Sequence, residues 1–329
     1  MDSMILFLVG VLTLGGFYAI LALILNMVAG WGGMSDLGVA GLVAVGAYTY
    51  VIVTQTAVPA DDILIAPGLP IWLGVVAAGL ATAAVALLIG MPTLRLRGEY
   101  FLITTLAFAE VIRQVALNAT PLTRGTVGFT QIERPFSDLL TGQQYRFALL
   151  AMVLGLVLLL FWLTRQVSSS PFGRVLRAIR DNEPVAVSLG KHVAAQRIAV
   201  YVFGGLLIGL VAPLYIWHIR TTVPNLFMSE MTFTVWTALV VGGIGSRVGP
   251  VVGGFVLILV TELFTFLQGS AENAQILAAT RPILLGLVLI LAMRFRPQGL
   301  VTERSAFRHA SSRTAAPETF RDDKEVVTS

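Results

Sequence analysis

Long apolar runs dominate this chain and decide the environment in which it can fold. They recur through most of the first 293 residues, and several reach the roughly 20 residues that a helix needs to cross the hydrocarbon core of a bilayer. Only 12% of the residues are charged, against about 25% in soluble proteins. So few charges cannot keep a surface of this size in water, and we expect the apolar excess to face lipid. The predicted fold is an all-α, polytopic bundle of membrane helices.

About nine apolar segments are expected to cross the membrane, within a range of eight to ten. The first run lacks a basic flank and a convincing cleavage site, so it is interpreted as a retained span and not as a signal peptide. Glycines within residues 29–56 could break one crossing into two half-helices, which would give ten segments and put both chain ends inside. The segments are residues 4–28, 38–56, 69–91, 101–118, 146–164, 195–217, 232–245, 249–268 and 276–293.

Positive charge gathers around residues 165–197 and after residue 293. Lys and Arg next to membrane spans are retained on the cytoplasmic side, so these regions and the C-terminus are predicted to be cytoplasmic. The net charge of +4 therefore indicates which loops are cytoplasmic and not a nucleic-acid partner. Nucleic-acid binding would be indicated by a basic face with interleaved aromatic residues, which this sequence lacks. Residues 1–301 are expected to form the transmembrane domain. The polar residues 302–329 are expected to form a disordered cytoplasmic tail.

Templates for catalysis are missing from the sequence. There is no His-Glu-x-x-His motif, no Gly-x-Ser-x-Gly motif and no cysteine, and the three histidines are scattered. Gly190 and Lys191 resemble the end of a phosphate-binding loop, but His192 stands where Ser or Thr is required. The sequence thus predicts no catalytic residue, no metal site and no cofactor, and any ATP must be bound by another chain.

A short amphipathic helix is predicted between two spans, within a loop of about residues 166–192. Ser170 suits the N-cap, Pro171 suits the first helical position, and Gly190 suits the C-terminal cap of a second short helix. Spacing at i, i+3, i+4 and i+7 places four apolar side chains on one stripe. Either the stripe lies on lipid headgroups or it docks into a groove of a partner protein. The stripe is Phe172, Val175, Leu176 and Ile179, flanked by Arg174, Arg177 and Arg180.

Few ionisable residues fall inside the expected spans, and each is costly in a bilayer unless it faces the bundle interior or a polar cavity. Glu110 and Arg113 are three residues apart, so they are either a structural pair on one helix face or part of a transport route. Asp36 is interpreted first as a helix N-cap. We retain Asp36, Thr104, Thr105 and Glu110 as candidates for lining a solute path.

Together these features resemble the LivM-type permease subunit of branched-chain amino acid ABC importers. The likeness extends over about residues 5–301, and the loop that contains the amphipathic helix lies where that family has its ATPase-coupling loop. We call residues 166–192 the coupling loop. The stretches that carry the resemblance are Gly30 to Tyr48, Leu94 to Arg113, Ser170 to Gly190, Gly242 to Gly254 and Phe295 to Leu300.

The resemblance implies a membrane transporter subunit that imports Leu, Ile or Val and does not itself hydrolyse ATP. Its partners would be a second, H-type permease, two ATP-binding subunits and an extracytoplasmic solute-binding protein, all at the bacterial inner membrane. It also implies that Phe172, Arg174, Val175, Leu176, Arg177, Ile179, Arg180 and Gly190 couple the permease to the ATP-binding subunits.

Two alternatives stay open from the sequence. Departures from the family pattern at Lys191 and His192, and in the loop from Thr123 to Gly128, allow the same build to import urea, short amides or other amino acids. An ion-coupled secondary transporter is the second alternative. That class usually has internal repeats with broken helices and an ion site at the midplane. The sequence shows neither a clear repeat nor a dense acidic cluster, which favours the ABC permease.

Overall fold

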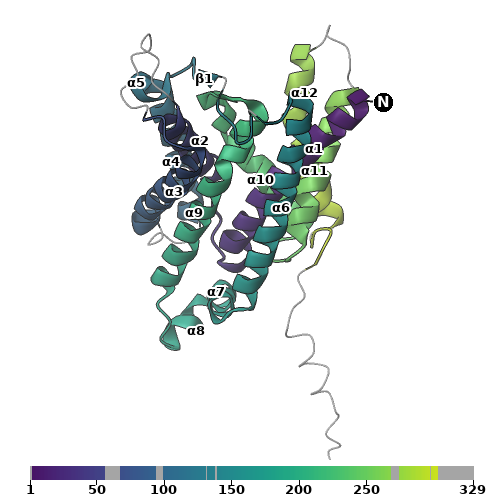
Figure 1. Ribbon diagram of the computed structural model, residues 1–329. Helices are drawn as coiled ribbons and strands as arrows, with labels where there is room; N and C mark the ends of the chain where they lie inside the picture. The colour runs from purple at the N-terminus through teal and green to yellow at the C-terminus, as the bar shows by residue number, and fades with distance from the viewer. Residues whose placement is uncertain are drawn as a thin grey trace, which may run out of the picture.

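The structure of the protein is a computed structural model (Figure 1). Its described part is almost entirely helical, with two-residue strands β1 and β2 paired antiparallel at one end of the bundle. The predicted tail, residues 302–329, lies outside the described residues except for its first residue. The structure describes residues 2–55, 67–93, 99–130, 132–137, 139–267, 274–296 and 298–302.

The elements follow one another along the chain with short connections, and a π-helix (η1) directly continues the first helix. They are α1 (Asp2–Leu25), η1 (Asn26–Trp31), α2 (Val39–Thr54), α3 (Ile71–Thr93), α4 (Glu99–Asn118), α5 (Thr120–Thr123), β1 (Phe129–Thr130), α6 (Gly142–Ser169), α7 (Pro171–Asp181), α8 (Glu183–Ser188), α9 (Val193–Ile219), β2 (Thr221–Thr222), the 3-10 helix η2 (Pro224–Phe227), α10 (Ser229–Gly242), α11 (Gly249–Leu267) and α12 (Ala274–Phe295).

Each of the nine predicted segments coincides with a helix of the described chain, which confirms the polytopic helical fold. Among the described residues, five helices are long and apolar enough to cross a membrane, and α2, most of α11 and the second half of α12 are shorter apolar helices. Residues 29–55 do not form the two half-helices of the alternative with ten segments. The glycine-rich stretch is indeed broken, since residues 32–38 are not helical, but a single helix, α2, follows the break.

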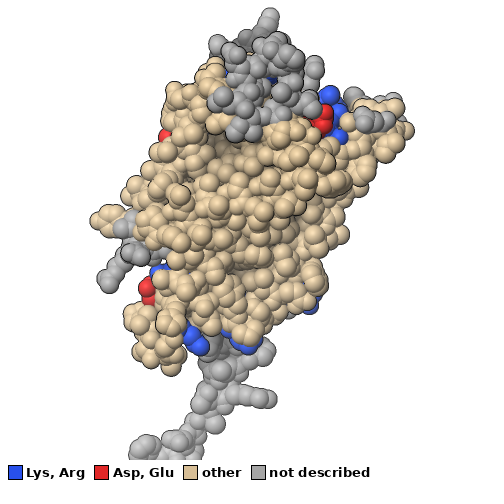
Figure 2. All heavy atoms as spheres, turned by 60° about the vertical axis from the view of Figure 1, so that its left-hand side comes forward, with Lys and Arg blue, Asp and Glu red and all other residues tan. Residues whose placement is uncertain are grey.

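Charged side chains gather toward the two ends of the molecule. The face shown in Figure 2 has a broad belt without Lys, Arg, Asp or Glu between charges at the top and at the bottom. Large apolar side chains of α3 and α4, such as Trp72, Leu80, Leu88 and Ile103, are more than half exposed. Such a surface matches the hydrocarbon core of a bilayer and confirms that the apolar excess lies on the outside of the bundle.

Two halves of the bundle repeat the same packing in opposite orientation. In the first half, α3 packs along α9 and α2 packs against α3, α4 and α9; in the second, α11 packs along α1 and α10 packs against α11, α12 and α1. The long helices α1 and α9 run antiparallel, because α1 ends beside α7 whereas α9 begins beside α8. The sequence shows no sign of this repeated packing. The helix packing is repeated without an evident repeat in the residues themselves.

Glycine and alanine make the close helix contacts possible in both halves. In the first half, Gly209 of α9 lies directly against Ala78 and Thr82 of α3. In the second, Gly254 of α11 lies against the backbone of Ala19 in α1. Membrane helices gain no hydrophobic free energy from meeting each other, so such small residues allow the van der Waals contact that holds the bundle together.

The helices α2 and α10 are too short to span the hydrocarbon core. With 16 and 14 residues they are about 24 and 21 Å long, against a core of roughly 30 Å. Each follows a stretch that is mostly not α-helical, residues 32–38 and residues 220–228. Their N-terminal turns meet inside the bundle, where the Ala40 backbone amide donates to Thr232 Oγ1 at 3.0 Å. The fold therefore places two helix starts inside the protein, where Ala40 of α2 and Thr232 of α10 are both buried.

The contact between α3 and α9 gives a first prediction. In Gly209→Ala, the new Cβ would overlap the Ala78 carbonyl oxygen and the Thr82 hydroxyl, so the helices must separate and the protein should lose about 1–3 kcal/mol of stability. A Cβ added at Gly155 in α6 would have no atom within 4 Å, so Gly155→Ala should cost nothing. Thermal unfolding in detergent compares the two, and equal midpoints would contradict this packing.

Candidate functional site

The coupling loop folds as the sequence predicts. Ser170 caps α7, since its Oγ accepts from the Gly173 amide at 3.2 Å, and Pro171 is the first helical residue. The second short helix, α8, ends in a Schellman motif around Gly190, which has φ +74°. In that motif the Gly190 amide donates to the Val187 carbonyl oxygen at 2.9 Å, and the Lys191 amide donates to the Ala186 carbonyl oxygen at 3.1 Å. The geometry of the helix–turn–helix loop is thus confirmed.

The apolar stripe of α7 faces the bundle and not a partner. Leu176 and Ile179 are 0% and 1% exposed, and Phe172 and Val175 are half-buried. Ile179 packs with Ala186 of α8 and with α9, while Leu176 belongs to the main core. The hypothesis that this stripe is a free docking surface or lies on headgroups is therefore wrong. An amphipathic helix buries its apolar face against the nearest apolar surface, here its own chain.

The face that the coupling loop does expose is formed mainly by α8. Val185, Val187 and Leu189 are 50%, 55% and 71% exposed at the tip of the loop, where Figure 1 shows α8 at the lower end of the bundle. Arg174 of α7 is also exposed, with its guanidinium on the Ser169 carbonyl oxygen at 3.0 Å. Three exposed apolar side chains on a six-residue helix and its cap form a small apolar surface. We call Val185, Val187 and Leu189 the loop tip.

Two arginines tie α7 to the body of the protein. Arg177 donates to Ser168 at the end of α6, to Oγ at 3.1 Å and to the carbonyl oxygen at 3.0 Å. Arg180 donates to the carbonyl oxygen of Gly30 in η1. Gly33 passes so close to α7 that a Cβ there would lie 3.2 Å from the Arg180 Cα, and its φ of +67° favours glycine. The coupling loop therefore contacts the backbone directly before and within the break of residues 32–38.

The π-helix η1 connects this contact to the second half of the protein. The Asn26 side chain donates to the Ser246 carbonyl oxygen at 2.8 Å and accepts from the Gly245 amide at 2.7 Å. Trp31 Nε1 donates to the Gly245 carbonyl oxygen at 3.1 Å. The loop that follows α10 is thus bonded to the same six-residue element that Arg180 contacts. Single-turn π-helices are frequent at functional sites.

Side chains of α4, of α10 and of the break itself bond three backbone groups of the break. The Leu37 amide donates to Thr105 Oγ1 at 3.0 Å, and the Gly38 amide donates to Asp36 Oδ1 at 2.7 Å. Trp236 Nε1 of α10 donates to the Asp36 carbonyl oxygen at 2.7 Å. The prediction that Asp36 is the N-cap is wrong, because α2 begins at Val39 and its N-cap is Gly38, without a side-chain cap bond. Asp36 is buried two residues before that position, and its carboxylate accepts the amide of Gly38 itself.

The four candidate path residues do not form one site. Asp36 and Thr105 are brought together at the break, whereas the Thr104 hydroxyl donates to the Tyr100 carbonyl oxygen of its own helix at 2.6 Å. Glu110 lies farther along α4 on an exposed face. A groove of about 620 Å³ lies beside the break, between α4, α10 and α12. Its walls are mostly apolar and include Leu37, Leu102, Phe233, Trp236 and Leu285.

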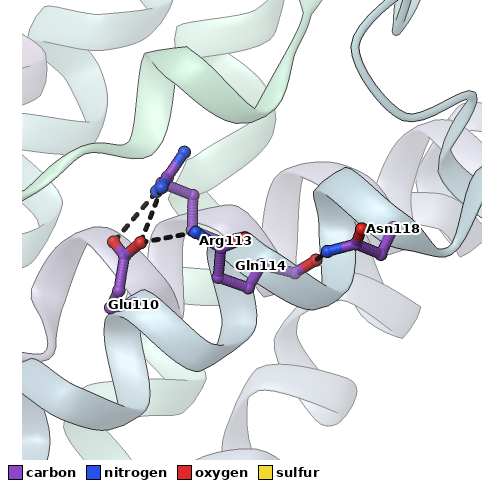
Figure 3. Close-up of polar contacts among 4 residues, drawn as sticks. All are labelled: Glu110, Arg113, Gln114 and Asn118. Atoms are coloured by element: carbon purple, nitrogen blue, oxygen red, sulfur yellow. Dashed lines mark hydrogen bonds and ion pairs between the residues drawn. The ribbon is translucent and has the colours of Figure 1, made fainter.

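Glu110 instead belongs to a polar face of α4 (Figure 3). Arg113 makes a two-pronged ion pair with it, Nε to Oε2 at 2.9 Å and Nη2 to Oε1 at 2.6 Å. Gln114 Nε2 also donates to Oε1 at 2.9 Å, and Asn118 donates to the Gln114 carbonyl oxygen at 2.7 Å. The predicted pairing of Glu110 with Arg113 is therefore present. It lies on a candidate membrane span, and Gln114 and Asn118 on the same side of α4 are exposed. We call Glu110, Arg113, Gln114 and Asn118 the polar face.

Sequence reasoning misses the residues that join distant elements. It places Arg180 beside a docking stripe and not at η1, and it does not single out Thr232, Trp236 or Asn26 as site residues. Each of these contacts spans more than 140 positions along the chain, for which a single sequence has no local signal.

A bundle with an apolar belt, irregular backbone held inside it and a structured loop at one end defines a polytopic membrane transport protein. Comparison with known proteins identifies it further. The family described as "Branched-chain amino acid transport system / permease component" matches residues 7–293, and the chain belongs to this family.

Individual relatives agree with this assignment. The chain is 30% identical over 317 residues to the high-affinity branched-chain amino acid transport system permease protein LivM of Escherichia coli strain K12, covering 89% of this chain and 69% of that protein. It is 25% identical over 321 residues to a probable branched-chain amino acid transport permease protein LivM of Methanocaldococcus jannaschii, covering 88% of this chain and 91% of that protein. A probable LivH permease of the same archaeon is 25% identical over 212 residues, covering 61% of this chain and 64% of that protein. No solved structure matches the chain.

Two neighbouring threonines of α4 test the geometry of the break. Thr105→Val removes the acceptor of the buried Leu37 amide, and an unpaired buried amide costs about 1–3 kcal/mol. Thr104→Val removes only a bond within its own helix, so it should leave stability almost unchanged. We expect a lower unfolding midpoint for the first variant alone, measured in detergent. A midpoint shift of the same size for both variants would contradict the predicted role of Thr105.

Proposed function

We propose that this chain is a permease subunit of an ATP-driven importer for branched-chain amino acids. The single observation that carries the proposal is the family match over residues 7–293, on a chain whose described helices include five of membrane-spanning length. Relatives named LivM and LivH support pairing with a second, H-type permease. ATP would be hydrolysed by two separate ATP-binding subunits, and an extracytoplasmic binding protein would deliver the substrate.

The site chemistry is compatible with an amphipathic cargo that carries no net charge. The groove beside the break is lined mainly by apolar side chains such as Leu37, Leu102 and Phe233, against which an aliphatic side chain can pack. The amides of Leu37 and Gly38 beside it already have acceptors, and the lining has few fixed charges for an ionic solute. Glu230 lines the groove as well and is the charged group nearest to such a cargo within it.

The polar face of α4 supports the pairing with a second permease. The Glu110 side chain is 46% exposed and that of Arg113 is 16% exposed, on a helix long and apolar enough to cross a membrane. Ionisable residues in spans almost always face the bundle interior or a water-filled cavity and not lipid. We therefore infer that the polar face contacts the second permease or borders the path between the two.

The loop tip is proposed as the docking surface for an ATP-binding subunit. Its apolar side chains are exposed, whereas the stripe of α7 is covered by the permease itself. Movement of the docked subunit would reach the break through α7, because Arg180 holds the Gly30 carbonyl oxygen and Gly33 lies against the same arginine. In this mechanism the coupling loop moves η1, and η1 moves both the break and the loop after α10.

Uptake by the reconstituted importer tests the proposed function. Vesicles that contain both permeases and both ATP-binding subunits should accumulate leucine, isoleucine or valine only with ATP on the side of the ATP-binding subunits and with the binding protein on the other. Urea and short amides serve as alternative cargoes in the same assay. Uptake by this chain alone under an ion gradient would refute the proposal in favour of a secondary transporter.

The loop tip gives a specific mutational prediction. Val187→Asp with Leu189→Asp places two charges in an apolar interface, each costing at least a few kcal/mol. A loss of roughly 4 kcal/mol weakens association about a thousandfold, so the ATP-binding subunits should no longer co-purify. The permease should still fold, because both positions are more than half exposed.

The matched control uses two equally exposed residues away from the coupling loop. Val127 and Leu139 are 75% and 79% exposed, in loops outside the long helices, so Val127→Asp with Leu139→Asp should leave co-purification unchanged. Normal recovery of ATP-binding subunits with the loop-tip variant, together with intact uptake, would remove docking from this surface.

Labelling of single cysteines tests the proposed orientation, in which the coupling loop and the C-terminus are cytoplasmic. The chain has no cysteine of its own, so each probe is unambiguous. Gly142→Cys, in an open position at the start of α6, should react with an impermeant reagent on intact cells. Leu189→Cys should react only after the membrane is opened. The reverse pattern would place the coupling loop on the wrong side for ATP.

A further inference from the structure

A second cavity, of about 610 Å³, lies at the end of the bundle opposite the coupling loop. It is enclosed by the first half of α1, the first turns of α6, the last turn of α9 and the loop before α6, and it is separate from the groove beside the break. Its lining has two kinds of wall. One is a stretch of α1 from Leu6 to Leu14 that is apolar except for Thr13. The other is strongly basic.

The basic wall holds three arginines and one histidine, from three elements that converge on the cavity. These are Arg134 of the loop, Arg146 of α6, and His218 and Arg220 at the end of α9. Among the described residues, no salt bridge reaches any of the three arginines. Glu262 of α11 is the one acidic residue in the described lining. The described part of the cavity therefore has an excess of positive charge.

Arg134 is the most confined of these groups. Its guanidinium stacks over the Tyr145 ring, 4.0 Å from the ring centroid, and it is half-buried. Burial, and after it the repulsion of the nearby Arg220, lower the pKa of Arg134 from its ordinary value. Arginine stays charged in proteins, so two neighbouring guanidinium groups at a cavity wall are most stable with an anion between them. Guanidinium groups bind phosphate and carboxylate with paired, charge-assisted hydrogen bonds.

The shape of the cavity indicates an anion with an apolar part. The arginines lie in the loop before α6, in its first turns and directly after α9, at the end of the spans, where phospholipid headgroups are expected. The apolar wall extends along α1 for nine residues, with a rise of about 12 Å between Leu6 and Leu14. On its other side, α1 exposes Met4, Leu8 and Leu12 to the surroundings. The short side chain of an acidic residue from a docked protein would leave most of this apolar wall uncovered.

We propose that this cavity binds the phosphate headgroup of an anionic membrane lipid, with the basic wall on the phosphate and a chain of the lipid along α1. The inference does not depend on the cargo or on the ATP-binding subunits, because it rests on surfaces at the opposite end of the bundle. It predicts a lipid site built into the permease, at which a charged headgroup holds α1, α6 and α9 together.

Two independent variants test the site. Arg134→Gln with Arg146→Gln removes two of the positive charges. Gly10→Phe places a ring in the cavity from the apolar side, because Gly10 lines the cavity and no atom lies within 4 Å of a Cβ added there. The matched controls are Arg165→Gln at the other end of α6 and Gly155→Phe, which is open but outside the cavity.

The measurement is binding of phosphatidylglycerol to the purified full-length chain in a neutral detergent, by native mass spectrometry. We expect each test variant to weaken binding at least tenfold and each control to leave it within twofold. Phosphatidylcholine with the same chains should bind at least tenfold more weakly. Thermal unfolding without lipid checks that the variants are folded. If the double arginine variant does not fold, lipid binding by Gly10→Phe alone tests the proposed site.

Three results would overturn the proposal. Equal phosphatidylglycerol binding by both test variants and the wild type would place the lipid elsewhere. Inorganic phosphate that binds as tightly as the lipid would make this a site for a soluble anion. Unchanged lipid binding together with loss of binding-protein docking in the arginine variant would make the basic wall a protein interface.

Discussion

The structure depends on one constraint, which is that backbone amides away from water need a partner. Residues 32–38 are irregular, and residues 36–38 are buried inside the bundle, where an unpaired amide would cost about 1–3 kcal/mol. The Thr105 hydroxyl of α4, the Trp236 indole of α10 and the carboxylate of Asp36 within the break supply partners for this backbone. The break can therefore exist only while α4 and α10 are packed against it, so the path region and the helix packing form one cooperative unit.

The two-halved architecture explains how such a unit can be moved. Long helices α1 and α9 form close contacts with α11 and α3 through small residues, and the short helices α2 and α10 start in the interior between them. Irregular backbone at membrane depth is tolerated where protein covers it or where it lines a cavity, and transporters place such breaks at the interface of their repeats. Repeats alone therefore do not distinguish an ion-coupled transporter from this chain; membership in the permease family does.

Local features of the structure could be predicted from the sequence, and long-range contacts could not. The nine segments, the Ser170 cap and the Gly190 terminus follow from apolar run length and capping chemistry, which act within a few residues. The amphipathic character of α7 was also predictable, but the partner of its apolar face was not, because periodicity specifies a face and not what covers it. The contact of Arg180 with Gly30 depends on how α7 and η1 meet, which only the folded chain determines.

The proposed coupling requires that movement of α7 reaches the break through Arg180. The most direct test is the ratio of leucine imported to ATP hydrolysed. Arg180→Gln removes the charged donor to Gly30 while leaving the loop tip exposed and intact. In the reconstituted importer we expect ATP-binding subunits at normal stoichiometry, continuing hydrolysis and a ratio at least tenfold lower. Arg174→Gln, on the exposed side of the same helix, should keep the ratio of the wild type. An unchanged ratio in Arg180→Gln would contradict this route of coupling.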